Sequence, residues 1–135
     1  MPRNMLDATF CIRLPRDRPQ GLRPRFTAEA ETLCISTITL TELLHGAARL
    51  ARPVENRRAV EGLVGRLVVL ALDEDAAAHA GEIHADLARR GQLIGPFGIL
   101  IAGHARSRGL VVITGNLGEF QHVDGVRAED WLAPT

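Results

Sequence analysis

The chain has 135 residues, of which 46% are hydrophobic and 24% are charged, a composition that is ordinary for a globular protein. This balance excludes a wholly disordered chain, and the longest apolar run, residues 67–72, is far shorter than the ~20 residues of a membrane span. Sixteen basic and sixteen acidic residues cancel, so no overall field draws the chain to nucleic acid or anionic lipid. No signal-peptide core follows Met1, and we predict a cytoplasmic protein with one domain over residues 1–135.

Lysine and cysteine usage excludes several classes of site. All sixteen basic residues are arginines, so the chain has neither a P-loop lysine nor a lysine for Schiff-base chemistry. Its two cysteines, Cys11 and Cys34, stand in apolar surroundings without a C-x-x-C pair, which excludes a zinc ribbon and a thioredoxin motif. We predict two buried, reduced thiols.

The first half of the chain is predicted to contain two strands and three helices. The clearest helix covers about residues 39–52, where apolar side chains recur at i, i+3, i+4, i+7 and i+11 until Pro53 ends the pattern. The other expected elements are a strand within residues 4–8, a weak helix over 9–14, a helical segment over 22–31 and a strand over 33–36.

The second half continues this alternation. Three acids at residues 73–75 suit the positive end of a helix that runs to about Arg90, and Pro96 suits the first turn of the next helix, which Gly109 ends. The remaining expected elements are a helix over 54–66, a buried strand over 67–72, a strand over 110–113, a helical turn over 116–120 and an edge strand with a tail over 126–131. Such alternation indicates an α/β fold with a parallel sheet between helices.

Polar side chains follow the ends of three predicted strands. Asp7 ends the first strand, Glu42 lies on the helix after the second, and Asn116 and Glu119 follow the fourth. Right-handed crossovers bring such positions to one rim, where open parallel sheets bind their ligands. Oxygen ligands without Cys or His favour Mg²⁺ or Mn²⁺, which can bind a phosphate oxygen and lower the pKa of an attacking water. This is the chemistry of phosphodiester hydrolysis.

Each of these residues also has a simpler interpretation. Asp7 can cap the helix that follows it. Thr39-x-x-Glu42 matches a capping box, and Asn116-x-x-Glu119 can form a similar cap. These interpretations do not exclude a metal site, because an acid that caps a helix can also bind a cation.

Several motifs in chain order carry a family resemblance. They are Met5-Leu6-Asp7, residues 35–47 (ISTITLTELLHGA), Gly81-Glu82-Ile83, Ile94-Gly95-Pro96, Ile101-Ala102-Gly103-His104-Ala105 and the tail around Trp131. With these motifs the whole chain resembles the PIN-domain toxins of the VapC family. The resemblance implies a PIN-like three-layer fold, in which helices flank a parallel sheet of four or five strands.

The same resemblance implies a function. VapC toxins belong to type II toxin–antitoxin modules and are Mg²⁺-dependent endoribonucleases, in which Mn²⁺ can replace Mg²⁺. A cognate VapB-type antitoxin neutralises the toxin, which usually forms a homodimer and reaches operator DNA only through the antitoxin complex. We therefore expect an RNA substrate, an antitoxin partner and no membrane association.

The resemblance also assigns roles to residues. It implies that Asp7 and Glu42 are metal ligands and that Asn116 and Glu119 are the last polar and acidic catalytic positions. Gly98 stands where the family usually has a metal-binding aspartate, in Gly-Pro-x-Asp. Since loss of even an outer partner of a metal costs ~10–100-fold in affinity or activity, we expect an impaired enzyme.

Two further positions that are commonly polar are also altered, since Ala8 follows Asp7 and Gly115 precedes Asn116. Decay of the copy, an alteration made to permit expression, or a metal held by Glu42, Glu119 and water alone would each explain Gly98. The alternative function is a catalytically dead PIN-fold binding module that dimerises and captures antitoxin. A phosphotransfer or nucleotide-binding domain is disfavoured, because lysine and a G-x-G-x-x-G motif are absent.

Other residues have less specific interpretations. Arg13, Arg16 and Arg18 are candidates for contact with RNA phosphates or antitoxin, or they belong to a solvated loop. We expect His104 to be a satisfied packing residue and Trp131 to fix the C-terminal tail to the sheet. No pattern among the five histidines indicates zinc.

Overall fold

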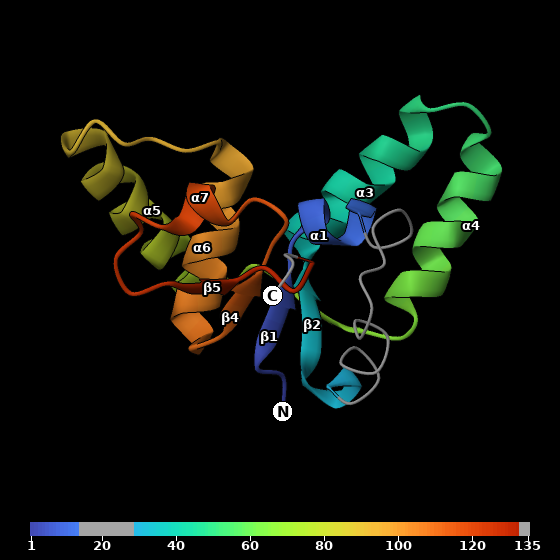
Figure 1. Ribbon diagram of the computed structural model, residues 1–135, viewed down its shortest axis with the longest axis horizontal. Coiled ribbons are helices and arrows are strands. Elements are labelled where there is room, and N and C mark those ends of the chain that lie inside the picture. Colours follow the sequence, from blue (N-terminus) through green and yellow to red (C-terminus); the bar gives the residue numbers. More distant parts are fainter. Residues whose placement is uncertain (14–28, 133–135) are drawn as a thin grey trace.

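A five-stranded parallel sheet forms the centre of the computed structural model, which describes residues 1–13 and 29–132 (Figure 1). Its strands are β1 (Asn4–Leu6), β2 (Leu33–Ser36), β3 (Val68–Leu70), β4 (Val111–Ile113) and β5 (Arg127–Glu129). Their order in the sheet is β3-β2-β1-β4-β5, and every neighbouring pair is parallel. The carboxyl ends of the central strands β2, β1 and β4 therefore lie at one edge of the sheet.

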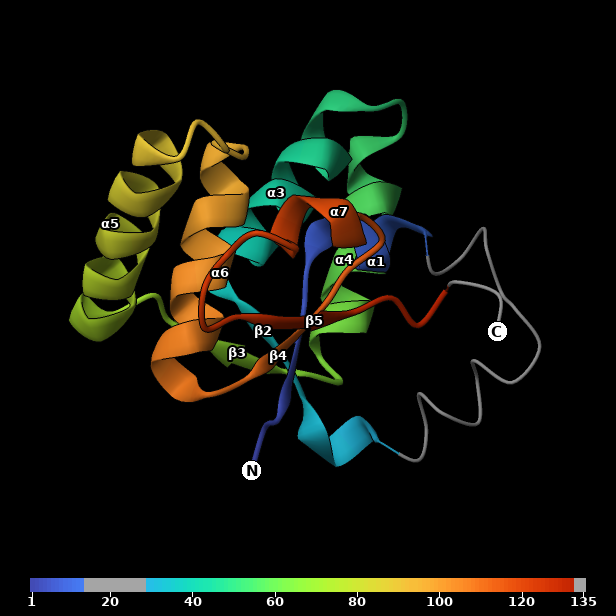
Figure 2. The same ribbon diagram turned by 60° about the vertical axis from the view of Figure 1, so that its left-hand side comes forward.

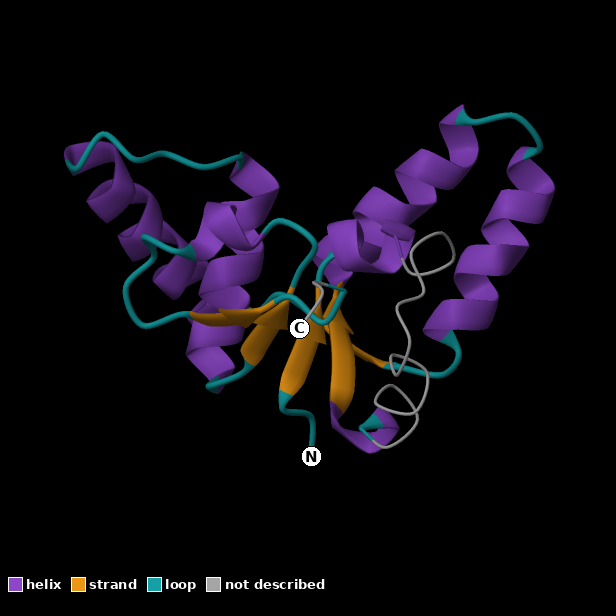
Figure 3. Cartoon of the chain, viewed as in Figure 1, coloured by secondary structure: helices purple, strands orange, loops and turns teal. Residues whose placement is uncertain are grey.

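Helices cover both faces of the sheet, as Figure 3 shows. One group lies on one face and consists of α1 (Ala8–Arg13), α3 (Thr37–Arg49) and α4 (Pro53–Val64). The other group consists of α5 (Glu74–Arg89), α6 (Pro96–Arg108) and the short α7 (Leu117–Phe120), and a 3₁₀ turn, η1 (Ala30–Thr32), precedes β2. The predicted three-layer α/β fold with four or five parallel strands is confirmed.

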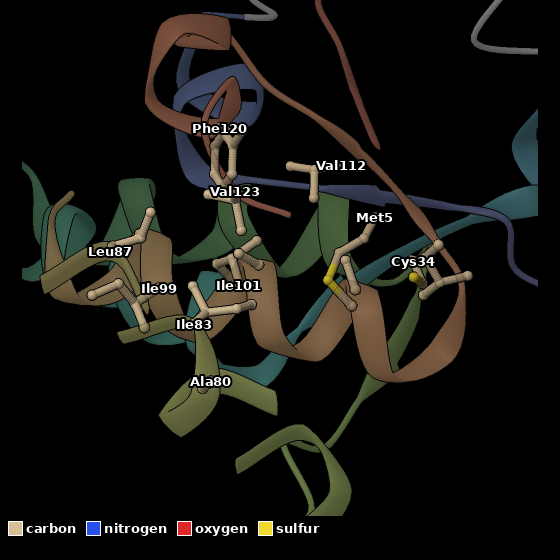
Figure 4. Packing of buried hydrophobic residues seen from close by; sticks show 13 residues of the cluster. Met5, Cys34, Ala80, Ile83, Leu87, Ile99, Ile101, Val112, Phe120 and Val123 are labelled. Atoms are coloured by element: carbon tan, nitrogen blue, oxygen red, sulfur yellow. The ribbon is translucent and has the colours of Figure 1, made fainter. Parts of the chain in front are cut away.

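Alternation along the strands divides the core into two clusters. On β1, Met5 packs under α5 and α6, whereas Leu6 packs under α1 and α3. Figure 4 shows the first cluster, in which Met5 and Cys34 meet apolar side chains of α5 and α6. Because both faces of the central strands are buried, β1 and β2 are almost entirely apolar.

The pair α5 and α6 is packed very closely, and Figure 2 shows the two helices side by side. A Cβ atom on Gly103 of α6 would lie 2.5 Å from the backbone nitrogen and 2.6 Å from the Cα atom of Ala80 on α5. No side chain fits there, so Gly103 is required by the contact. This packing fixes the position of the α6 N-terminus, which begins at Gly95-Pro96 beside the sheet edge.

Two local predictions are wrong. The segment 67–72 was expected as a buried strand, but β3 is an edge strand whose Val68 and Val69 are 47% and 37% exposed. The alternative interpretation of Thr39-x-x-Glu42 as a capping box is also wrong, because the helix starts two residues earlier than predicted, at Thr37, and Ser36 caps it by accepting from the amide of Ile38. The predicted helical segment 22–31 lies mostly outside the described residues.

No helix among the described residues is long and apolar enough to cross a membrane.

Candidate functional site

A pocket of about 210 Å³ opens at the carboxyl edge of the sheet, between α1, α3 and the N-terminus of α6. Three carboxylates from distant parts of the chain line it: Asp7, Glu42 and Glu119. The other lining residues are Ala8, Thr9, Gly95, Pro96, Phe97, Gly98, Ile101 and Phe120. The fold thus brings together three of the four residues for which we predicted a catalytic role.

Asp7 is the first residue after β1 and is buried at the start of α1. Its Oδ1 atom accepts from the Phe10 amide at 2.9 Å and from the Thr9 hydroxyl at 2.7 Å. The carboxylate therefore caps α1, as its simpler interpretation predicts. Within the described residues, both hydrogen bonds to this carboxylate go to Oδ1, and Asp7 lines the pocket.

Glu42 lies in the second turn of α3 and not at its cap. The preceding turn is fixed to β1, because the buried Thr39 hydroxyl donates to the carbonyl oxygen of Leu6 at 3.4 Å. Leu6 directly precedes Asp7, so this contact places the Glu42 turn next to the first acid. The helix positions Glu42 by tertiary packing rather than by a local capping motif.

Asn116 and Glu119 form a pair at the start of α7. The Asn116 side chain donates from Nδ2 to Oε2 of Glu119 at 3.0 Å and makes no side-chain capping bond. The cap predicted for Asn116-x-x-Glu119 is therefore wrong. Asn116 does not line the pocket itself, and its contact with the site goes through the Glu119 carboxylate.

The three acids influence one another electrostatically. Burial raises the pKa of Glu42 above its usual value, and the negative charges of Asp7 and Glu119 raise it further. Burial and then the Asp7 charge also raise the pKa of Glu119, while the hydrogen bond from Asn116 opposes this shift. A pocket in which acids repel one another stabilises an incoming cation.

Gly98 lies in the first turn of α6, as predicted, and borders the pocket. A Cβ atom at this position would collide with Oε1 of Glu119 and would lie 3.0 Å from its Cδ atom. The Glu119 carboxylate thus occupies the space into which a side chain at position 98 would project. The third acid of the pocket comes from α7 and not from α6.

Two hydroxyl groups near the site could not be predicted from the sequence. Thr9 and the fully buried Thr114 approach each other with their Oγ1 atoms 3.2 Å apart. Thr9 also accepts from the Gly115 amide at 2.9 Å, and Thr114 accepts from the Asn116 amide at 2.9 Å. The polar residues after two predicted strands were the only sequence signal for this contact, which joins residues 105 positions apart.

Other predicted residues lie outside the pocket. Arg16 and Arg18 fall outside the described residues, and of Arg13 only the backbone position in α1 is described. Trp131 is buried in the cluster that contains Leu6 and Ile113 of the sheet, so its predicted role in fixing the tail is confirmed, and it also meets Phe10 of α1 edge to face, with ring centroids 6.1 Å apart. His104 is buried, and its Nδ1 atom pairs with the Ser36 hydroxyl, but its Nε2 atom has no hydrogen-bond partner among the described groups, contrary to the prediction.

The oxygen ligands of the pocket suit a hard cation that binds only a few protein groups. Among the described residues, no three His, Cys, Asp or Glu side chains come close enough to form a complete metal cage. Mg²⁺, however, usually keeps several waters and takes only one or two protein carboxylates. The two carboxylates of Asp7 and Glu42 match this coordination preference, and Mn²⁺ accepts the same oxygen ligands.

Comparison with known proteins gives a consistent assignment. Residues 5–126 match the PIN domain family. The tRNA(fMet)-specific endonuclease VapC of Salmonella typhimurium is 49% identical over 127 residues, which are 94% of this chain and 96% of that protein. Ribonuclease VapC2 of Haemophilus influenzae is 39% identical over 132 residues, which are 98% of this chain and 100% of that protein.

Solved structures agree with this assignment. The crystal structure of DNA-bound VapBC from Salmonella typhimurium matches with a TM-score of 0.92 and 48% identity, covering 97% of this chain and 99% of that one. The VapBC-1 structure from nontypeable Haemophilus influenzae matches with a TM-score of 0.88 and 32% identity, covering 96% and 98%. The chain therefore belongs to the PIN-domain family, in which it groups with the VapC toxins.

Proposed function

We propose that the chain is the toxin of a type II toxin–antitoxin module and a Mg²⁺-dependent endoribonuclease that hydrolyses RNA phosphodiester bonds in the cytoplasm. The observation that carries this proposal is the shared pocket of Asp7, Glu42 and Glu119. It lies at the edge of a parallel sheet where ligands usually bind. The VapC relatives are named as an endonuclease and a ribonuclease, which supports hydrolysis of RNA as the reaction class.

In this proposal each pocket residue has a distinct role. Asp7, through the oxygen that does not cap α1, and Glu42 hold the cation. Mg²⁺, when bound, would supply Lewis acidity toward a phosphate oxygen and would lower the pKa of a bound water. Glu119, whose pKa is raised, would be suited to accept a proton at its carboxylate, which Asn116 orients.

The names of the relatives support a proposal for the substrate and the partners. The VapC of Salmonella typhimurium acts on tRNA(fMet), so initiator tRNA is the first substrate to test. We propose that a VapB-type antitoxin neutralises the chain, that the chain forms a homodimer, and that it contacts operator DNA only within the antitoxin complex. Arg13, Arg16 and Arg18 remain predicted contacts to phosphate or antitoxin.

We further propose that this copy has lower activity than VapC enzymes with an aspartate in the Gly-Pro-x-Asp segment. Gly98 offers no ligand atom, and Glu119 fills the space beside it. Loss of partners around a metal costs ~10–100-fold in affinity or activity. The absence of a side-chain ligand at position 98 also supports the second candidate function, a catalytically dead module that dimerises and captures antitoxin.

A cleavage assay distinguishes the two candidates. The purified chain is incubated with an initiator-tRNA transcript in Mg²⁺, in Mn²⁺ or in EDTA. We expect slow, metal-dependent cleavage that Asp7→Asn abolishes and that Glu61→Gln, on the exposed face of α4, leaves unchanged. Structured RNA that stays intact at every metal concentration, together with capture of the Salmonella typhimurium VapB chain, would establish the binding module instead.

A further inference from the structure

A chain of hydrogen bonds connects two of the pocket acids, Asp7 and Glu119. It starts at Asp7 Oδ1, passes through the hydroxyl groups of Thr9 and Thr114, and ends at Asn116. The Asn116 side chain then donates to Oε2 of Glu119. We call the two threonines, Thr9 and Thr114, the hydroxyl bridge.

The direction of each hydrogen bond in the bridge follows from proton counting. A threonine hydroxyl has one proton to donate. Thr9 gives its proton to Asp7 at 2.7 Å, so at its 3.2 Å contact Thr114 is the donor and Thr9 the acceptor. Thr114 in turn accepts from the Asn116 amide. The donors from the Asn116 amide through Thr114 to Thr9 therefore point toward the Asp7 carboxylate, whereas the Asn116 side chain points the opposite way, toward Glu119.

The bridge also joins two parts of the fold that carry the site. Thr9 belongs to the first turn of α1, and Thr114 directly follows β4. Thr9 accepts a second bond, from the Gly115 amide, so its oxygen contacts the β4–α7 connection at two points. The connection that leads to Glu119 is thereby tied to the residue that orients Asp7.

We propose that Thr9 is a positioning residue that fixes the Asp7 and Glu119 carboxylates relative to each other. The inference rests on the proposed function, because it assumes that these acids form the working site. Three neighbouring positions offer no polar side chain: Ala8, Gly98 and Gly115. The hydroxyl bridge supplies the orientation instead: Thr9 lines the pocket and is exposed, and Thr114, its partner, is buried.

The test compares Thr9→Val, which keeps the shape but removes the hydroxyl, with Thr9→Ser, which keeps the hydroxyl. Thr41→Val is the matched control, since Thr41 is exposed on α3 and its hydroxyl donates only within that helix. The first readout is Mn²⁺ affinity by titration calorimetry. We expect Thr9→Val to bind Mn²⁺ ~10–100-fold more weakly, the range for loss of an outer-shell partner, and Thr9→Ser to stay close to the parent.

The second readout does not depend on metal or on RNA. In Thr9→Val the Gly115 amide loses its Thr9 acceptor, so its hydrogen exchange should become at least about threefold faster, whereas Thr41→Val should leave it unchanged. A parent chain that neither cuts RNA nor binds Mn²⁺ would refute the proposed function. Faster hydrogen exchange of the Gly115 amide in Thr9→Val would still support the hydroxyl bridge in that case. Unchanged exchange and unchanged Mn²⁺ affinity in Thr9→Val would overturn the bridge, even in an active enzyme.

Discussion

Glu119 occupies the space in front of Gly98: Oε1 of the glutamate lies where a Cβ atom on residue 98 would have to be. The obstacle is the end of a flexible side chain, and the nearest atom outside that side chain, Ile94 Cδ1 at 3.3 Å, is only slightly tight. A new side chain at position 98 can therefore be accommodated if the Glu119 carboxylate rotates away. Such a rotation would also displace Oε2, the atom that accepts from Asn116.

The first prediction concerns the restored acid. Gly98→Asp adds a carboxylate at the pocket wall, so we expect cleavage of initiator tRNA to increase by about 10-fold or more, the lower end of the effect of one metal partner. Initial rates in saturating Mg²⁺ measure the change. Gly98→Ala is the matched control, because its methyl group displaces Glu119 equally but adds no ligand. An equal gain in both variants would assign the effect to the movement of Glu119.

The second prediction concerns stability and pH. The folded-state pKa of Glu42 is raised above its ordinary value of 4.5, so the folded chain binds this proton more tightly than the unfolded chain does. The contribution of Glu42 to stability is therefore most favourable below pH 4.5 and is lost as the pH rises through the folded pKa. Glu42→Gln removes a partly buried charge and its repulsion from Asp7 and Glu119, and it should stabilise the fold at pH 7 by roughly 0.2–1 kcal/mol, because solvent screens charges in the open pocket.

Urea unfolding of the parent and of Glu42→Gln between pH 4 and pH 7.5 tests this sign. The difference between the two should grow with pH, and Glu42→Gln should at the same time lose cleavage. Glu61→Gln provides the control on an exposed surface. A Glu42→Gln variant that is less stable than the parent at pH 7 would show that Glu42 makes a favourable contact instead.

The third prediction concerns the α5–α6 contact. Gly103→Ala places a methyl group against the backbone of Ala80, which cannot move without shifting α5, so we expect a loss of about 1–3 kcal/mol in the free energy of unfolding. Gly81→Ala, on α5 with open space around its Cα atom, should instead gain about 0.4–1 kcal/mol. Thermal unfolding measures both. Equal effects at the two positions would refute the close contact.

The fourth prediction concerns the two thiols, which are free and buried as the sequence predicted. Burial raises the pKa of Cys11 and of Cys34 to about 12, and the Asp7 charge adds to the shift at Cys11. Almost no thiolate is present at pH 8, so neither cysteine should react with Ellman's reagent in the folded chain. Both should react within minutes in urea. Rapid reaction under native conditions would indicate that the core opens locally.

The sequence predicted the acids of the pocket because a general topological rule applies to them. Asp7 follows a strand, and parallel strands with right-handed crossovers end at one edge, so its proximity to Glu42 and Glu119 did not require coordinates. The alternation of apolar segments likewise predicted the three layers. The boundaries were less accurate, since the caps depend on single residues such as Ser36, whose hydroxyl starts α3 earlier than the apolar pattern does.

Other features could not be predicted because they depend on distant residues. Apolar composition did not distinguish the edge strand β3 from a buried one, since exposure depends on which strand lies beside it. The contact of Thr9 with Thr114 and the position of Glu119 over Gly98 join parts of the chain far apart in sequence. No local pattern encodes such contacts.

The strand order has a consequence for the newly made protein. β1 is synthesised first but sits in the middle of the sheet, and its neighbour β4 begins only at Val111. A chain that is still growing on the ribosome has no complete pocket until its last quarter has emerged, because Glu119 follows β4. The complete pocket would then form only late in translation. An inhibitor already present in the cell could bind the pocket as soon as it forms.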